Sequence, residues 1–251
     1  MKFQSFGHSD IGPSRPNNED VWIALPRVRF FALADGMGGH KSGEIAAQEA
    51  IENLADNFPL KNDPDSAIMM EQLHQAICKA NHWVHRLGRH HKDFNGMGTT
   101  LCCLYFHRNS VIYAHVGDSR IYRWRKGHID KLTEDHSAIR EWLAKTARGE
   151  PPTSPQPLKN IITRAIGMDS QVHPEIARSK VEKGDLYFLC SDGLSDFVTE
   201  RKMEEILSQT HSLEEAVKSF IQTAKENGSN DNITVVMVQI EDLYETADLS
   251  G

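Results

Sequence analysis

The spacing of apolar residues along this chain changes from helical to strand-like and back. This succession of helical and strand-like segments constrains the fold most. Residues 47–58 and 69–87 carry apolar side chains at helical spacing. Between residues 99 and 132 the pattern turns into short β-rich segments joined by tight connections, which is typical of an antiparallel meander. Because strands and helices come in blocks rather than in alternation, we expect α+β layers and not a parallel βαβ sheet. The expected strands cover 21–24, 29–34, 99–106, 110–116, 119–124, 128–132, 186–190 and 233–240, and two later helices cover 201–208 and 213–226.

The size and composition of the chain limit what it can be. A chain of 251 residues, 39% of them hydrophobic, can bury one substantial core, so we expect a single domain over residues 1–242 and a short polar tail over 243–251. A formal net charge of −7 argues against nucleic acid as a partner. No apolar run approaches the roughly 20 residues that span a bilayer. With four cysteines and no disulfide spacing, we expect a cytoplasmic protein without a membrane partner.

A proline-rich excursion interrupts the strands. Residues 136–148 can form a helix, but the prolines between 151 and 157 cannot continue it. We therefore expect residues 136–165 to be largely exposed.

Two apolar runs end in the same dipeptide. Residues 30–34 lead into Asp35-Gly36, and residues 186–191 lead into Asp192-Gly193. Burying a carboxylate at the end of a buried strand costs free energy. The glycine beside it has no Cβ and permits another backbone segment to approach closely. Further acidic residues stand beside other apolar runs. The carboxylates at these strand ends and turns are Glu19, Asp20, Asp35, Asp118, Asp192 and Asp231.

These carboxylates together indicate a cation site. Oxygen donors without nitrogen or sulfur suit Mg²⁺ or Mn²⁺ rather than Zn²⁺. So many carboxylates cannot stay ionised side by side without cations. Two bridged cations and a shared water can hydrolyse a phosphomonoester, and Arg15 can bind the phosphate oxygens with its guanidinium fork. Each turn alone is ordinary, but the coincidence of four of them beside apolar strands favours the cation site.

Six short motifs follow one another along the chain. They are Arg15-Pro16-Asn17-Asn18-Glu19-Asp20, Ala34-Asp35-Gly36-Met37-Gly38-Gly39-His40, Gly98-Thr99-Thr100, Val116-Gly117-Asp118-Ser119-Arg120, Ser191-Asp192-Gly193 and Asn230-Asp231-Asn232-Ile233-Thr234. In these motifs and in their order the chain resembles the PPM (PP2C-like) family of protein serine/threonine phosphatases, bacterial type. The resemblance covers about residues 5–240.

The resemblance implies a four-layer α/β/β/α sandwich, in which two central antiparallel sheets are flanked by helix pairs. It implies that Asp35 bridges two metal ions and that the Gly36 carbonyl binds one of them. Asp192 and Asp231 would complete the other ion's ligands, and Asp118 with Asp192 matches a third site. By the same resemblance the excursion 136–165 is the family's flap.

The remaining roles also follow from the resemblance. Glu19 and Asp20 would hold metal-bound waters, and Arg15 would orient the substrate phosphate. Many eukaryotic members carry a histidine after the first Asp-Gly, proposed as the acid for the leaving group. Met37 stands there in this chain. A metal-bound water or His40 could supply the proton instead.

The resemblance implies a monomeric enzyme that hydrolyses phosphoserine and phosphothreonine on protein substrates and opposes a cognate Ser/Thr kinase. It would use two or three Mn²⁺ or Mg²⁺ ions. A catalytically silent binding module would lack Asp35 or Asp231, and both are present. A Ca²⁺-binding structural domain would gather its ligands in one compact loop, whereas these are scattered.

Two other patterns have the spacing of a catalytic or metal-binding site. Cys102 and Arg108 have the Cys-x₅-Arg spacing of cysteine-dependent phosphatases, but no glycine separates them, and strand-like alternation favours Cys102 as a core residue. His82 and His85 are spaced i, i+3 on a predicted helix, where a solvated flank explains them better than a metal site.

Overall fold

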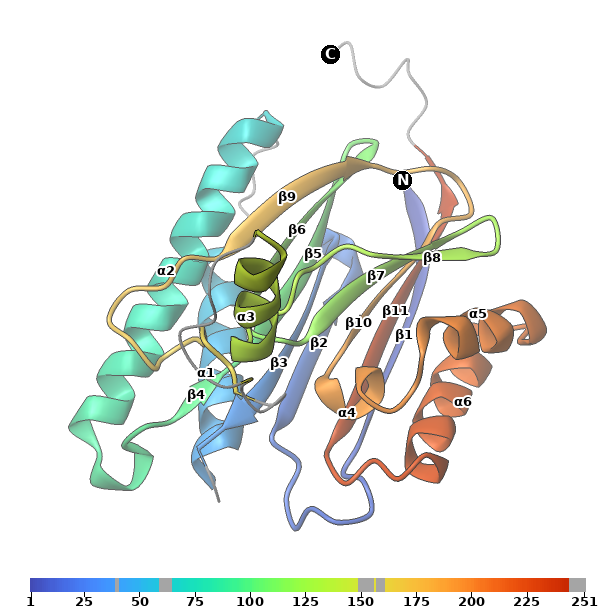
Figure 1. Cartoon of the computed structure of the whole chain (residues 1–251). Coiled ribbons are helices and arrows are strands. Elements are labelled where there is room, and N and C mark those ends of the chain that lie inside the picture. Colours follow the sequence, from blue (N-terminus) through green and yellow to red (C-terminus); the bar gives the residue numbers. More distant parts are fainter. Residues whose placement is uncertain (39–40, 59–64, 149–155, 157–160, 244–251) are drawn as a thin grey trace.

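Two antiparallel sheets face each other, and each carries helices on its outer face (Figure 1). This arrangement confirms the predicted α+β sandwich. The computed structural model describes residues 1–38, 41–58, 65–148, 156 and 161–243.

Each sheet has its own strand order. The first runs β1 (Lys2–Asp10), β11 (Ile233–Asp242), β10 (Leu186–Cys190), β7 (Arg120–Arg125) and β8 (His128–Lys131). The second runs β2 (Asp20–Leu25), β3 (Phe30–Met37), β5 (Leu101–His107), β6 (Ser110–Val116) and β9 (Glu175–Lys180), and β4 (Gly98–Thr99) pairs with the end of β3.

The helices divide between the two outer faces. α1 (Lys41–Asn57) and α2 (Ser66–His90) cover the second sheet, whereas α5 (Glu200–Gln209) and α6 (Leu213–Glu226) cover the first (Figure 1). The shorter helical pieces are η1 (Pro26–Val28), η2 (Lys92–Phe94), α3 (Ala138–Ala147) and α4 (Asp192–Ser195).

The central strands are buried on both faces, which explains their nearly continuous apolar sequences. Along β3 the side chains alternate, so that Phe30 and Ala32 pack under α1 while Phe31 and Leu33 point to the opposite sheet. The two sheets meet through aromatic rings: Phe106 of the second sheet packs edge-on against Tyr187 of the first, with ring centroids 5.5 Å apart. Phe106 also packs edge-on against Phe31 of its own sheet at 5.9 Å. Such pairs stabilise the interface beyond the burial of their area.

The later helix pair shows why the sequence starts helices where it does. The Thr199 side chain accepts a hydrogen bond from the Lys202 amide before α5, and the Ser212 side chain accepts one from the Glu215 amide before α6. These caps satisfy amides that have no partner within the helix. The buried face of α6 then contains Val217 and Phe220, which pack on the first sheet.

The prediction of one meander over residues 99–132 is wrong in one respect. β5 pairs with β6 and β7 pairs with β8, but these two hairpins belong to different sheets. The chain changes sheets at Gly117, whose φ of 102° turns the backbone away from β6. The strand period is the same on both sides of this turn, so periodicity alone does not separate the hairpins.

Two strands were not predicted at all. β1 and β9 are edge strands that carry polar and charged side chains between apolar ones. Backbone pairing with β11 holds β1, and pairing with β6 holds β9. Neither strand therefore needs an apolar pattern of its own.

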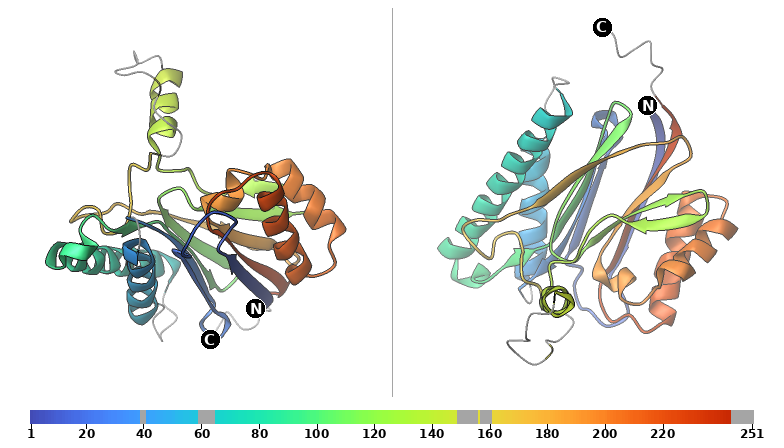
Figure 2. Two further views of the ribbon diagram at one scale, coloured as in Figure 1. Left: turned by 90° about the horizontal axis from the view of Figure 1, so that it is seen from below. Right: turned by 45° about the horizontal axis from the view of Figure 1, so that its top comes forward.

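The predicted excursion contains α3, which projects from the body of the molecule (Figure 2). None of its residues is buried. The stem of the excursion is fixed by backbone hydrogen bonds from Ala138 to Ile161 and from Thr163 to His136, at 2.8 Å each. The predicted tail after residue 243 lies outside the described residues. In the described part of the chain, no helix combines the length and apolar character needed to cross a membrane.

Candidate metal centre

The pairing of β2 with β3 brings the first group of carboxylates together. Asp20 and Asp35 are register partners, and the Gly36 amide donates to the Glu19 carbonyl at 3.1 Å. Partners across an antiparallel pair lie about 5 Å apart. The register of this hairpin therefore places Glu19, Asp20 and Asp35 at one end of the second sheet.

The glycines of the two Asp-Gly pairs permit close packing of backbone, as their positions predict. A Cβ at Gly36 would overlap the carbonyl group of Gly43 on α1, and a Cβ at Gly193 would overlap the carbonyl oxygen of Asn232. Without these glycines the backbone segments around both aspartates would have to move apart.

Asp20 is held by hydroxyl groups from the opposite sheet. Its Oδ2 accepts hydrogen bonds from Ser191 Oγ at 2.8 Å and from Thr234 Oγ1 at 2.6 Å. Its Oδ1 is buried and has no hydrogen-bond partner among the described residues. Asp20 thus joins the two sheets at the end where the other carboxylates lie.

Asp35 is held through its backbone. The Thr100 amide donates to the Asp35 carbonyl at 2.8 Å, and the Asp35 amide donates to Thr100 Oγ1 at 2.9 Å. The same Thr100 hydroxyl lies 2.6 Å from Ser119 Oγ, in the loop that carries Asp118. These bonds fix the backbone and leave the Asp35 carboxylate available to a ligand.

Asp192 and Asp231 approach from the first sheet. Asp192 is the first residue of α4 and is separated from the buried strand β10 by Ser191 alone. Its Oδ1 is a second buried oxygen without a partner among the described residues. Asp231 stands two residues before β11. Asn232 connects this end to the N-terminal loop, because its Oδ1 accepts from the Glu19 amide at 2.8 Å.

A cleft of about 410 Å³ collects these groups. Its wall contains residues from both sheets and from the stem of the excursion, where Ile162 reaches it. The polar and charged side chains in its wall belong to Arg15, Asn17, Glu19, Asp35, Asp118, Asp192, Asp231 and Asn232, and the Gly36 backbone also lines it. Most of this set is predicted from the sequence; Asp20 does not line the cleft but is the register partner of Asp35.

The carboxylates disfavour one another's charge. Burial raises the pKa of Asp20 to about 6, although hydroxyl donors oppose this, and burial raises that of Asp118 to about 6 as well. Burial and the neighbouring aspartates raise the pKa values of Asp35 and Asp192 well above the ordinary value. An electropositive group in the cleft would relieve this repulsion.

The donor set fits divalent cations with a preference for oxygen. Within the described residues the wall offers carboxylate, amide and backbone oxygens and no histidine or cysteine. Asp20 and Asp192 each keep a buried oxygen without a hydrogen-bond partner there, and such atoms are costly unless something binds them. Mg²⁺ and Mn²⁺ accept this kind of ligand, whereas Zn²⁺ sites usually include nitrogen or sulfur.

Arg15 lies at the mouth of the cleft in contact with a carboxylate. Its Nη2 lies 2.6 Å from Asp231 Oδ2, and about half of the arginine side chain is exposed to solvent. The guanidinium thus supplies the positive charge next to Asp231. Its exposed donors face solvent, where an anionic substrate would arrive.

Several other predicted residues can be placed. Met37 lines the cleft beside Gly36, in the position where a protonating side chain was considered. His40 lies outside the described residues. Cys102 is fully buried in the core between the sheets, and burial raises its pKa well above the ordinary value, so it is no thiolate nucleophile. His82 is exposed, and His85 Nδ1 lies 3.0 Å from the Gly167 carbonyl.

Some residues that organise the site were not singled out individually. Thr99 and Thr100 hold Asp35, Ser191 and Thr234 hold Asp20, and Asn232 holds Glu19. Each is adjacent to a predicted motif or part of one. Buried hydroxyl and amide side chains at strand ends, next to acidic turns, are the sequence signal that could have identified them.

The fold and the cleft together define a class of protein: a two-sheet sandwich with a carboxylate-lined cleft at one end that is suited to cations. Comparison with known proteins identifies the family within this class. The chain matches the protein phosphatase 2C family over residues 11–227. A serine/threonine phosphatase, stp, of Listeria welshimeri is 35% identical over 235 residues, covering 92% of this chain and 93% of that protein.

Solved structures agree. The Streptococcus agalactiae serine/threonine phosphatase superposes with a TM-score of 0.86 and 32% identity, covering 96% of this chain and all of that one. The catalytic domain of the phosphatase PstP, solved in complex with two manganese ions, gives a TM-score of 0.80 and 33% identity, covering 96% and 99%. The chain belongs to the protein phosphatase 2C (PPM) family, bacterial type. It is a metal-dependent protein phosphatase.

Proposed function

We propose that this enzyme hydrolyses phosphoserine and phosphothreonine on proteins at a centre that holds two Mn²⁺ or Mg²⁺ ions. The observation that carries the proposal is the cleft itself, where four aspartates and Glu19 converge from both sheets. The names of the similar phosphatases, and the two manganese ions in the PstP structure, support the substrate class and the cation.

The ligand roles are those that the family resemblance implies, and the lining of the cleft is compatible with them. Asp35 would be the ligand shared by two ions, and the Gly36 carbonyl would bind one of them. Asp192 and Asp231 would hold the second ion, and Asp118 together with Asp192 would hold a third. Glu19 and Asp20 would orient waters around the ions.

When bound, the cations lower the pKa of a water between them and provide the nucleophile near neutral pH. The protein's own groups do the rest. Arg15, at the mouth, binds phosphate oxygens through its guanidinium fork and holds the phosphorus in line for attack. The hydroxyls of Ser191 and Thr234 keep Asp20 oriented. Met37 has no proton to give, so the leaving alkoxide takes its proton from a bound water or from His40.

The wider role also remains a proposal. We infer a phosphatase domain over residues 1–242 with its flap at 136–165, and an enzyme that opposes a Ser/Thr kinase on shared protein substrates. We further propose that the enzyme is monomeric and cytoplasmic and that it uses Mn²⁺ or Mg²⁺.

A peptide assay tests the proposal. We expect release of phosphate from phosphoserine and phosphothreonine peptides that requires added Mn²⁺ or Mg²⁺ and stops with a chelator. A thiol alkylator has no effect, because Cys102 is buried. Asp93→Asn, at an exposed aspartate on η2, is the matched control for changes in the cleft. Turnover that resists chelation but is lost on alkylation would contradict the metal mechanism.

A further inference from the structure

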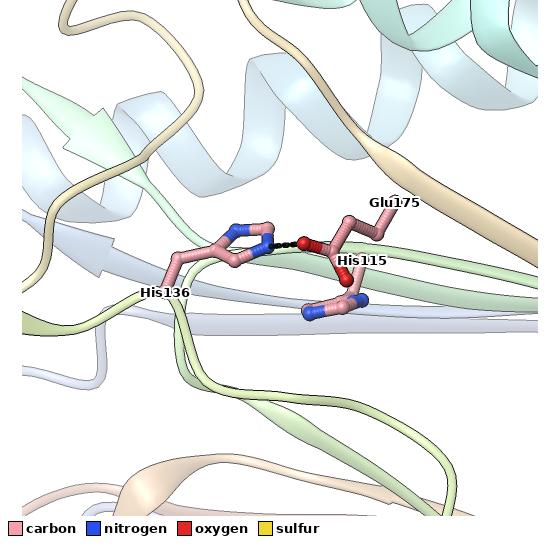
Figure 3. A group of neighbouring side chains, drawn as sticks. All are labelled: His115, His136 and Glu175. Atoms are coloured by element: carbon pink, nitrogen blue, oxygen red, sulfur yellow. Dashed lines mark ion pairs between the residues drawn. The ribbon is translucent and has the colours of Figure 1, made fainter. Parts of the chain in front are cut away.

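His115, His136 and Glu175 form a cluster outside the carboxylate cleft (Figure 3). The two imidazole rings stack with centroids 4.5 Å apart, and His136 Nε2 lies 3.1 Å from Glu175 Oε1. Both histidines are buried. The cluster lies where β6, β9 and the stem of the excursion meet, which raises the question of whether it binds a metal or holds the chain in place.

The hydrogen bonds decide where the protons of these rings lie. The Gly117 amide donates to His136 Nδ1 at 3.1 Å, and because a backbone amide can only donate, Nδ1 carries a lone pair. The proton of the neutral ring is then on Nε2, which donates to Glu175. His115 Nε2 lies 2.8 Å from the Glu134 carbonyl oxygen and must donate to it.

A metal ion does not fit these roles. An ion on His136 Nε2 would move the ring proton to Nδ1, where it would face the Gly117 amide proton. Arg164 Nη1 already lies 3.2 Å from His136 Nε2 and donates a hydrogen bond to Glu175 Oε1. The guanidinium cation therefore lies next to the atoms that a metal ion would bind. The rings are inclined by only 25°, so their in-plane lone pairs do not converge well on one point.

The contacts of His136 lead instead toward the catalytic cleft. Its backbone amide donates to the Gly117 carbonyl at 2.9 Å. His136 therefore holds Gly117 through both its amide and its carbonyl. The next residue is Asp118. Ser119 follows, whose hydroxyl contacts the Thr100 that holds Asp35.

The same histidine also holds the excursion. Its carbonyl accepts from the Thr163 amide at 2.8 Å, and the neighbouring Ile162 lines the cleft. His136 is therefore in contact with both the Asp118 loop and the returning arm of the stem.

We propose that His136 is a positioning residue that holds Asp118 in place for the third cation by fixing the Gly117 amide through its Nδ1. Glu175 supports this by accepting the Nε2 proton, and His115 supports it by stacking on the ring. The inference rests on the proposed function, since it concerns the cation assigned to Asp118.

Two substitutions separate the hydrogen bond from simple packing. In His136→Asn the side-chain oxygen can take the place of Nδ1 and accept from the Gly117 amide. His136→Gln is closer to histidine in length but places its polar atoms at Nε2. If volume alone mattered, glutamine would replace histidine better; if the hydrogen bond matters, asparagine would.

Binding of Mn²⁺ is measured through the spectroscopic signal of the free ion, with thermal denaturation to establish that each variant folds. We expect His136→Gln to raise the dissociation constant of the Mn²⁺ site that Asp118→Asn also impairs about 10–100-fold, the range for lost supporting contacts around a metal. His136→Asn should restore most of the affinity. In an Asp118→Asn background, which already lacks the ligand, His136→Gln should cause no further loss. Glu175→Met, at a half-exposed residue, should give a smaller loss in the same direction.

The outcomes distinguish the possible failures. Normal Mn²⁺ binding by His136→Gln, or better binding by glutamine than by asparagine, would overturn the inference while leaving the phosphatase proposal intact. Uptake of Zn²⁺ that His115→Ala abolishes and Asp35→Asn leaves unchanged would show that the cluster is a metal site after all. Failure of the unaltered protein to bind either Mn²⁺ or Mg²⁺ would overturn the proposed function and this inference with it.

Discussion

At the scale of single residues, the ionised carboxylates of the cleft lower the stability of the folded protein when no cation is bound. Burial raises the pKa of Asp20 and of Asp118 to about 6, and burial with the neighbouring aspartates raises the pKa values of Asp35 and Asp192 well above the ordinary value. A carboxyl group whose pKa is higher in the folded than in the unfolded protein destabilises the fold once it ionises. The fold therefore gives up stability in order to hold a strong binding site, as is common at functional sites.

Asp20→Asn measures this cost. The pKa of Asp20 is 3.8 when unperturbed and about 6 in the folded protein, so its cost is small below pH 4, grows between pH 4 and 6, and is complete above pH 6. In the presence of a chelator we expect the variant to match the parent near pH 4. Above pH 6.5 it should be more stable, by on the order of 2–3 kcal/mol. Denaturant unfolding at both pH values checks this, and a stability difference independent of pH would contradict it.

Arg15→Ala separates substrate binding from chemistry. The guanidinium contacts Asp231 and otherwise faces solvent at the mouth of the cleft, so its loss should weaken phosphate binding. We expect KM for a phosphopeptide to rise about 10-fold or more, with a smaller fall in kcat, because a charged hydrogen bond is worth roughly 1.5–3 kcal/mol. Steady-state kinetics at saturating Mn²⁺ measures both, with Arg27→Ala as the control at an exposed arginine on η1. An unchanged KM would exclude the assigned role.

At the scale of secondary-structure elements, the site depends on how closely strand ends approach one another. Gly193, the second residue of α4, lies against the Asn232 carbonyl, and Gly36 lies against the Gly43 carbonyl. The first contact brings the end of β10 close to the residues before β11, and the second brings the end of β3 close to α1. Glycine after the aspartate is therefore as much a part of the site as the aspartate.

Gly193→Ala tests this. The added methyl group would overlap backbone, which cannot move aside as a flexible side chain can, so we expect a loss of several kcal/mol in the free energy of unfolding. Gly228→Ala is the matched control: its added methyl meets open space, and only its φ of 87° costs about 1 kcal/mol. Equal losses in the two variants, measured by chemical denaturation, would show that close approach at Gly193 is unimportant.

The sequence predicts most elements because their burial follows simple periods. β3, β5 and β11 are continuous apolar runs, and α6 shows a clear apolar face. β1 and β9 escape prediction because their partners, not their own side chains, hold them. The set of carboxylates is predicted from their positions at strand ends and turns, and their individual roles from the resemblance. Thr100 and Asn232 become visible as supports of the site only when the strands are placed.

At the scale of the whole molecule, the two sheets act as rigid supports for a cleft at their shared end. The first sheet supplies Asp192 and Asp231, and the second supplies Asp35, while Asp118 lies where the chain crosses between them. Because no single element carries the full set, the cation site exists only in the assembled sandwich. Binding of cations should in turn stabilise the folded protein by mass action.

The most direct test of the central claim is to locate manganese in a crystal by its anomalous scattering. We predict two strong peaks in the cleft, one on each side of Asp35, with the Gly36 carbonyl at one and Asp192 and Asp231 at the other. The same experiment on Asp35→Asn should show both peaks lost or greatly weakened. Manganese bound elsewhere, or a cleft that stays empty in crystals of an active, Mn²⁺-dependent enzyme, would contradict the account.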